Sequence, residues 1–489
     1  MIAALILIAL AAFAALALGV LARAGRDMGL EQWAVGGRGF GWVFVFLLLA
    51  GEIYTTFTFL GASGFSYGLG APAYYIIAYG SLAYVIAYFL LPPIWAYAKQ
   101  HGLHSQPDFF VRKFGSPALG ALVSLVGLVA LIPYLVLQLT GLGIIVVAAG
   151  YGAVSKDAAI WIGAIIVTVY VMVSGIRGSA WTAVVKDVLI LVVVVFLGLY
   201  LPFHLYGGIG PMFERIAAAK PGFLVFRPSG QSVAWFVSTV LLTALGFFMW
   251  PHSFAACYTA RDARVFRRNA IVLPIYQLIL LFVFFVGFAA VLQVPGLKGG
   301  ATNLALFKLV TKEFPPVVVG IVGAAGIFTA LVPGSLIVMT AGMLLSKNLV
   351  GLARPGASDE QTVTLAKWLV PVVMLVAVYF TITGNATIVT MLLVGYSYVT
   401  QLFPAVIASL MPRNPVSAAG AFAGILTGVV VATILTFTHA TVGTLMPGLP
   451  EAIRDLNVGI IALAANIVVL LVVSALTRTR VAPADAARG

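Results

Sequence analysis

Long apolar stretches recur along nearly the whole chain, separated by short polar loops. A helix needs about 20 mostly apolar residues to cross the hydrocarbon core of a bilayer. The first stretch has no basic residue ahead of it and is followed by Arg23 and Arg26, which favours a retained helix over a cleaved signal peptide. The pattern predicts about 13 spans, at residues 2–22, 42–68, 72–98, 118–148, 158–176, 181–202, 232–257, 270–293, 316–345, 365–383, 386–411, 415–438 and 457–476.

The composition narrows the class of protein further. Of the 489 residues, 62% are hydrophobic and only 8% are charged, and the mean hydropathy is +1.12. These values exclude a disordered chain, a secreted disulfide scaffold and a cytosolic enzyme. The one cysteine, Cys257, can form neither an intramolecular disulfide nor a multi-cysteine metal site. We therefore expect an all-α polytopic membrane protein in which residues 1–489 form one membrane domain.

The formal net charge of +13 comes from basic residues in the short loops between spans. With the N-terminus outside, the inner loops hold 18 lysines and arginines and the outer loops hold 8. Basic residues accumulate in the cytoplasmic loops of membrane proteins. The sequence therefore predicts an outer N-terminus and a cytoplasmic C-terminus. The expected partners are a small solute and the lipid bilayer, with no nucleic acid and no obligate protein partner.

Two of the spans contain residues that interrupt a helix. Span 42–68 combines Gly51 and Glu52 with several threonines at about mid-membrane, and span 232–257 contains Pro251. The two spans lie five apart and therefore cross in opposite directions. Broken helices at the first positions of two inverted five-helix repeats are typical of secondary transporters. The alternative is that the glycines only allow helices to pack closely.

Several motifs, in order along nearly the whole chain, resemble the solute:sodium symporter family. This resemblance implies a leucine-transporter-type fold, with repeats at 42–202 and 232–411, an extra N-terminal helix at 2–22 and two extra C-terminal helices at 415–476. The motifs are Gly-Arg-Gly-Phe-Gly at 37–41, Thr-Phe-Leu-Gly at 58–61, Gln-Pro-Asp-Phe at 106–109, Ser-Gly-Ile-Arg-Gly at 174–178, Pro-His at 251–252 and Gln-Leu-Phe-Pro at 401–404.

Within that family, Tyr134, Gln138 and residues 181–187 and 330–333 look most like the monocarboxylate permease branch. The resemblance implies a cation-coupled symporter that imports a short acid such as lactate, pyruvate or acetate across a bacterial inner membrane. A Na⁺-coupled symporter of proline, pantothenate or another amino acid or vitamin is the first alternative, and an ion or solute channel is the second. No phosphate-binding loop supports an ATP-driven pump, and no nucleophile motif supports an enzyme.

Hydrogen-bond donors for a small carboxylate can come from half-helix ends, hydroxyls and a histidine. For any single tyrosine or threonine, an interhelical hydrogen bond is the alternative role. The remaining histidines show no metal-ligand spacing, and no organic cofactor is expected. The candidate substrate-binding residues are Tyr54, Thr55, Thr56 and Thr58 on the second span, Tyr134 and Gln138 on the fourth, Trp250 and His252 on the seventh, and Tyr396, Tyr398 and Gln401 on the eleventh.

Three charged residues fall within the spans, namely Glu52, Lys186 and Asp187. Each would cost roughly 2.5–3.5 kcal/mol in lipid, so each should face a cavity or a partner. Glu52 could take up a proton or serve as a structural carboxylate. Lys186 and Asp187 are consecutive, so their side chains point about 100° apart on a helix and need not pair. Asp187 could instead meet water or a neighbouring helix.

The resemblance also bears on the coupling ion, and here the chain departs from its family. The family's Na⁺ site maps onto Gly51 and Tyr54 of the second span and onto Thr329, Val332 and Pro333 of the ninth, where both expected hydroxyls are lost unless Ser335 or Thr340 replaces them. The family's Thr-Asp-x-x-Gln pattern reads Thr-Ala-Val-Val-Lys at 182–186. A lysine ammonium can occupy the place of a monovalent cation. We hypothesise that Lys186 substitutes for Na⁺, with Glu52 as a further proton carrier, or that Lys186 extends to the cytoplasmic interface. The coupling ion is left open between Na⁺ and H⁺.

Overall fold

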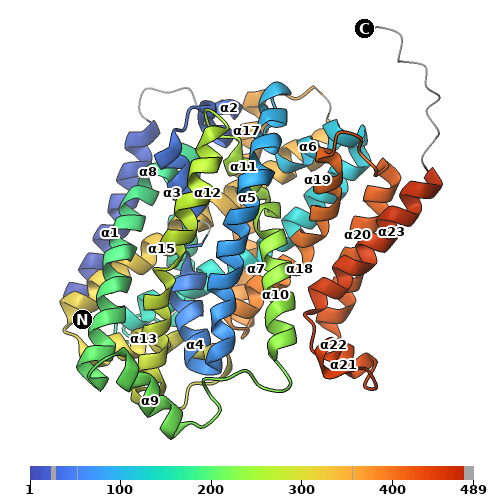
Figure 1. Cartoon of the computed structure of the whole chain (residues 1–489). Coiled ribbons are helices and arrows are strands. Elements are labelled where there is room, and N and C mark those ends of the chain that lie inside the picture. The colour runs from blue at the N-terminus through green and yellow to red at the C-terminus, as the bar shows by residue number, and fades with distance from the viewer. Residues whose placement is uncertain (24–28, 52, 355, 478–489) are drawn as a thin grey trace, which may run out of the picture.

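The computed structural model describes residues 1–23, 29–51, 53–354 and 356–477, and these residues form a helical bundle (Figure 1). The one β-bridge among them joins Phe40 to Ala260. The long helices are α1 (Ile2–Arg23), α5 (Tyr75–Gln100), α7 (Pro117–Ala149), α8 (Lys156–Tyr206), α12 (Arg264–Gln277), α13 (Leu280–Gln293), α15 (Pro316–Met343), α17 (Asp359–Thr383), α18 (Ile388–Val399), α20 (Ala418–Phe437) and α23 (Val458–Thr477). Short helices include α2 (Leu30–Val35), α6 (Gln106–Phe114), α9 (Ile209–Ala219), α14 (Ala305–Glu313) and α19 (Phe403–Leu410).

Hydroxyl side chains mark where many of the helices begin. The oxygen of Ser116 accepts the backbone N–H of Leu119 at the start of α7, and Ser155 does the same for Ala158 at the start of α8. A hydroxyl at this position satisfies a backbone donor that has no partner within the helix. The same N-cap occurs at Ser232, Ser358, Thr387 and Ser417, which precede α10 (Val233–Gly246), α17, α18 and α20.

Within the described residues, ten helices are long and apolar enough to span a membrane, or eleven if the bent pair α10 and α11 (Pro251–Cys257) forms one span. This count is lower than the 13 expected for two reasons. Helix α8 has 51 residues and includes two expected spans, which join at Gly175, where φ 59° and ψ −170° are not helical. The expected span 42–68 is divided between α3 (Trp42–Gly51) and α4 (Ser63–Leu69), each too short to be counted.

Both expected interruptions are present. Helix α3 ends at Gly51, and the chain turns at residues 53–55 before the π-helical segment η2 (Phe57–Ala62) continues into α4. Helix α10 continues as one 3-10 turn, η4 (Phe247–Met249), and α11 then leaves at a bend of 55°. Trp250 is extended at this bend, with ψ 132°. Each break places backbone groups in the interior without their helical partners.

Around these breaks, α15 packs against α1, α7 and α8, while α20 and α23 pair with each other at the edge of the bundle (Figure 1). The α20–α23 pair contacts the other helices mainly through α18 and the short turn η7 (Thr400–Leu402). Small residues allow the close approach, since a Cβ on Gly424 would lie 2.5 Å from Leu470 Cβ. Helices α20 and α23 therefore form a helical hairpin at the edge of the bundle.

Hydrogen bonds between loops show which loops lie at the same end of the bundle. Arg38 donates to the carbonyl of Leu103 at 2.7 Å, and Arg177 donates to the carbonyl of Gly36 at 2.7 Å. At the other end, the backbone N–H of Ser232 donates to Asp455 at 2.8 Å. The hydrogen bonds of Arg38 and Arg177 join loops that the sequence places inside. Helices α2 and α6 lie at this end, in the upper part of Figure 1. We call it the inner end.

A candidate solute and cation site between two broken helices

The first break is held by two of the expected threonines. Thr58 Oγ1 donates to the carbonyl of Ile53 at 2.7 Å and lies 3.0 Å from the carbonyl of Thr55. Thr55 Oγ1 accepts the N–H of Phe57 at 3.0 Å. Hydroxyls that satisfy freed backbone groups allow a membrane helix to break. Thr55 and Thr58 therefore stabilise the turn itself.

Thr56 points instead to α7. Its Oγ1 donates to Gln138 Oε1 at 2.7 Å, and Gln138 is only 1% exposed. Among the described residues, Nε2 of Gln138 has no hydrogen-bond partner. This buried donor lies directly beside the first broken helix, where a bound solute could accept from it.

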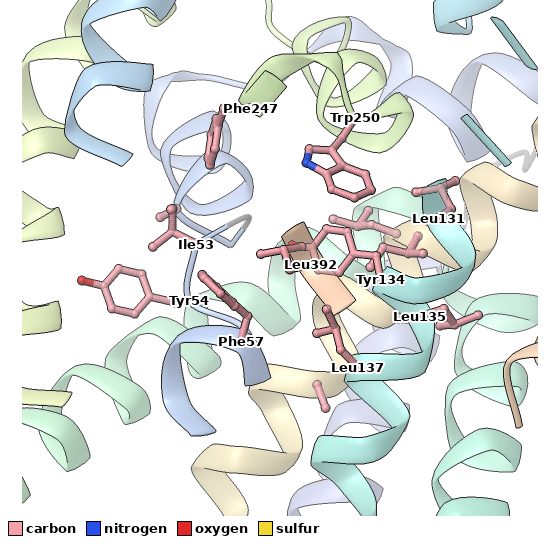
Figure 2. Packing of buried hydrophobic residues seen from close by; sticks show 14 of the residues in the cluster. Ile53, Tyr54, Phe57, Leu131, Tyr134, Leu135, Leu137, Phe247, Trp250 and Leu392 are labelled. Carbon is pink, nitrogen blue, oxygen red and sulfur yellow. The ribbon is translucent and has the colours of Figure 1, made fainter. Parts of the chain in front are cut away.

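The second break contributes an aromatic cluster. The ring of Tyr134 on α7 lies 4.8 Å from Trp250 and 5.3 Å from His252, between ring centres. Tyr396 on α18 lies 5.3 Å from Trp250. Figure 2 shows Tyr134 and Trp250 turned toward one another, with Leu131 and Leu392 nearby. These four expected residues are brought together and fully buried.

Three expected residues point elsewhere. The hydroxyl of Tyr54 donates to the carbonyl of Tyr276 at 2.7 Å, and its ring points away from Trp250 in Figure 2. Gln401 donates to the carbonyl of Ser397 at 3.0 Å and accepts from Asn466 of α23 at 3.1 Å. Gln401 thus joins α18 to the C-terminal hairpin. Tyr398 likewise accepts from Thr433 of α20 at 3.2 Å.

Lys186 reaches the first break. Its side chain is completely buried, and Nζ donates to the carbonyl of Tyr54 at 3.3 Å. Nζ also lies 2.9 Å from a carboxylate oxygen of Asp187, so the two consecutive side chains do pair. A Cβ on Gly51 would lie 3.2 Å from the same ammonium. Lys186 therefore does not extend to the interface, and Asp187 has Lys186 as its ion-pair partner.

The expected hydroxyls of α15 have other partners. Thr329 Oγ1 donates to the carbonyl of Gly326 at 2.6 Å. Ser335 Oγ donates to the carbonyl of Val332 at 2.6 Å and lies 2.8 Å from Ser179 Oγ on α8. Val332 packs with Leu47 and Ala183 in a small apolar cluster. Glu52 lies outside the described residues, which contain no group of three or more acidic, histidine or cysteine side chains placed to hold a metal.

Sequence reasoning missed one residue that shapes the second break. Gln106 of α6 donates from Nε2 to the carbonyl of Met249 at 2.8 Å, although the two residues are 143 positions apart. Its motif was visible as part of the family resemblance, but nothing local in the sequence indicates the residue that it contacts.

A sequence profile of the Sodium:solute symporter family matches residues 33–428. The chain belongs to this family. Its relatives include the uncharacterized symporter YhjB of Bacillus subtilis (strain 168), 63% identical over 461 residues that cover 94% of each chain. A monocarboxylate transport permease protein of Rhizobium johnstonii is 29% identical over 454 residues, which cover 91% of this chain and 90% of the permease.

A solved structure extends the family assignment to the fold. A Na⁺-coupled sialic acid symporter in a substrate-bound outward-open state superposes with a TM-score of 0.79, covering 97% of this chain and 98% of that one at 17% identity. The expected leucine-transporter-type fold is therefore confirmed. Family and fold together indicate a multi-pass membrane protein that performs cation-coupled symport, and a transporter rather than an enzyme.

Proposed function

We propose that this symporter imports a small organic anion, a short monocarboxylate such as lactate, pyruvate or acetate. The relative named a monocarboxylate transport permease supports this substrate class. The site supports it too, because its walls are aromatic rings and the one intramembrane lysine described is already paired with Asp187. A small acid would therefore be bound by neutral donors of the described residues, apart from the lysine that is already paired.

The substrate proposal rests on Nε2 of Gln138, which has no hydrogen-bond partner among the described residues. A buried donor without a partner costs about 1–3 kcal/mol. A carboxylate oxygen placed beside Tyr134 and Thr56 would accept this hydrogen bond and remove that penalty. The aromatic cluster of Trp250, His252 and Tyr396 then packs on the other side of the small solute.

Competition against labelled lactate uptake in proteoliposomes tests the substrate class. Acetate and pyruvate should compete, whereas alanine, proline and pantothenate should not. Gln138→Leu should raise the KM for lactate about tenfold or more, since a charge-assisted hydrogen bond is worth about 1.5–3 kcal/mol. Gln401→Leu is the matched control, because that buried glutamine joins the hairpin, and its KM should stay near wild type.

Competition only by the neutral or amino-acid solutes would refute the monocarboxylate assignment. Uptake that saturates and shows counterflow is expected for a symporter. Sustained single-channel current would favour the channel alternative instead.

For the coupling ion, we propose that the Lys186 ammonium takes the position of a bound Na⁺ and that H⁺ is the coupling ion. The contact from Lys186 Nζ to the carbonyl of Tyr54 carries this proposal, because that carbonyl is one of the two expected Na⁺ ligands. The ammonium holds the first break while protonated. Transfer of its proton to the neighbouring Asp187 carboxylate leaves both groups neutral, releases the Tyr54 carbonyl and frees the half-helices to tilt.

Initial uptake should be measured with and without Na⁺ at fixed pH, and then with an imposed inward proton gradient. Wild-type uptake is expected to persist without Na⁺ and to rise with the proton gradient. Lys186→Ala should abolish the response to the gradient, whereas Lys308→Ala, an exposed lysine on α14, should preserve it. Strict Na⁺ dependence together with a functional Lys186→Ala protein would refute the proposal.

The remaining assignments follow from the same arrangement. We propose that 42–202 and 232–411 are the inverted repeats, because each begins with a helix that leads into one of the two breaks. This helix is α3 in the first repeat and α10 in the second. We also propose that the protein lies in a bacterial inner membrane with its N-terminus outside.

A further inference from the structure

A short helix outside the membrane spans, α6, reaches the second broken helix. At the break, Trp250 is extended and Pro251 has no N–H, so the helical hydrogen-bond ladder is interrupted. Gln106 fills this gap with its amide, which donates to the carbonyl of Met249 at 2.8 Å. Gln106 is only 1% exposed, so this hydrogen bond lies inside the protein. The position of Trp250 and His252 therefore depends on the position of α6.

A carboxylate anchors α6 in turn. Asp108 is paired with Lys347 and accepts from Asn348 Nδ2 at 3.0 Å, and both partners lie in η6 (Leu344–Val350), the π-helical continuation of α15. Asp108 also accepts the backbone N–H groups of His104 and Ser105, each at 3.0 Å. One side chain thus fixes the start of α6 and ties it to the inner end of α15.

These contacts close the space between the central site and the inner end. A cavity of only about 20 Å³ remains there, lined by Gln106, Pro251, Ala255, Met339 and Met343 among others. A buried water needs about 10–15 Å³ by such a measure, so the gap has room for about one water. A solute leaving the aromatic cluster toward the inner end cannot pass while α6, α11 and α15 stay in contact.

The Asp108–Lys347 ion pair lies where water can reach it as it separates. A cavity of about 620 Å³ on the other side of α6 is lined by Asp108 and Lys347, whose side chains are 16% and 24% exposed. The Lys186–Asp187 pair, by contrast, is 0% and 5% exposed. Separating a buried pair leaves bare charges in the interior, whereas water can solvate a partly exposed pair as it parts.

We propose that Gln106, Asp108 and Lys347 form an inner latch that holds the transporter closed at its inner end. Gln106 acts as a positioning residue for Trp250 and His252, and breaking the Asp108–Lys347 pair releases α6 and α11 together. This inference rests on the alternating access of a symporter and is independent of which solute or ion is carried.

The native cysteine supplies a reporter. Cys257 is the one cysteine of the chain, is 0% exposed and lies at the end of α11. The rate of N-ethylmaleimide labelling in the purified, detergent-solubilised protein therefore measures how often α11 is released. Lys347→Met should raise this rate at least about fivefold, the lower range of typical coupling between two conformations. Gln106→Glu, which keeps the shape but loses the amide donor, should raise it similarly.

Matched variants separate the latch from general loss of structure. Lys347→Arg keeps the ion pair and should label at the wild-type rate, as should Arg413→Met, which removes an exposed basic residue of the loop between α19 and α20. Cys257→Ser should abolish labelling. In proteoliposomes, Lys347→Met should change kcat more than the KM for solute, because it leaves the hydrogen bond from Gln106 to Met249 in place. Wild-type Cys257 reactivity in folded, monodisperse Lys347→Met and Gln106→Glu proteins would overturn the proposal, whether or not lactate is a substrate.

Discussion

At the residue scale, Gly51 lies beside the Lys186 ammonium at the first broken helix. A Cβ there would lie 3.2 Å from Nζ, a tight distance that the flexible lysine can relieve only by moving away. We expect Gly51→Leu to abolish transport with little loss of folded protein, because it displaces the ammonium from the break. Uptake and gel filtration of the purified variant measure the two effects.

Gly210→Leu is the control for that substitution, since nothing lies within 4 Å of its Cβ position and the residue is on the exposed helix α9. Near-normal uptake by Gly51→Leu would show that the closeness of Gly51 to Lys186 is not required. A variant that fails to fold would point to a packing role for Gly51.

Individual side chains were predicted well where the sequence itself carries a conformational signal. Gly51 and Pro251 break helices for local reasons, and the structure has both breaks. Tyr396 and Gln401 show the opposite case. They are five residues apart, about 140° around a helix at 100° per residue, so only Tyr396 faces the aromatic cluster. Lys186 and Asp187 pair because a long, flexible lysine can bend back to its neighbour.

At the scale of elements, the break in α8 depends on one glycine. Gly175 has φ 59° and ψ −170°, a region that is essentially restricted to glycine. Gly175→Ala should lower the free energy of unfolding by about 1–3 kcal/mol, the typical strain of such a conformation. Thermal unfolding in detergent measures the change.

Gly334→Ala in α15 is a suitable comparison, because its Cβ would make only ordinary contacts at 3.8 Å and its backbone is helical. Equal melting temperatures for the two variants would mean that α8 can adopt a regular helix through this position. The sequence predicts two spans that meet here, at 158–176 and 181–202, and the kink at Gly175 separates the two parts of α8.

The anchor of α6 gives a prediction on pH. Burial raises the pKa of Asp108, but the Lys347 ammonium and the hydrogen bonds from Lys347, His104 and Asn348 outweigh it and hold that pKa below its ordinary value. A carboxyl group with a lowered folded-state pKa stabilises the protein above its unfolded pKa of about 4, and this contribution is lost as the pH falls further. The melting-temperature difference between wild type and Asp108→Asn should therefore be constant from about pH 8 to pH 5 and shrink below about pH 4.

His104 is the other titratable group beside this carboxylate. Burial, followed by the nearby Lys347, lowers the pKa of His104, although Glu31 opposes the shift. His104→Asn should leave the difference between wild type and Asp108→Asn unchanged at pH 8, where the imidazole is neutral. Protonation of His104 beside the ionised Asp108 would enlarge the difference, since Asp108 favours the charged imidazole. A difference that already shrinks between pH 7 and pH 6 would therefore contradict an ionised Asp108.

At the scale of the whole molecule, contacts between distant loops sort the chain into two ends. Sequence periodicity placed the apolar stretches and their order, because membrane helices need long uninterrupted apolar runs. It could not place side chains that meet across hundreds of residues, such as Tyr54 with Tyr276 or Asp108 with Lys347. Which end faces the cytoplasm follows only from the distribution of basic residues.

That orientation can be tested with single cysteines in a Cys257→Ser background. Ser229 lies in the exposed loop before α10, and Glu360 lies exposed at the start of α17, at the inner end. If the end rich in lysine and arginine is cytoplasmic, a membrane-impermeant maleimide should label Ser229→Cys in intact cells and Glu360→Cys only after permeabilisation. The reverse pattern would contradict the positive-inside assignment and would place the inner latch on the outer side, where it would control solute entry instead of release.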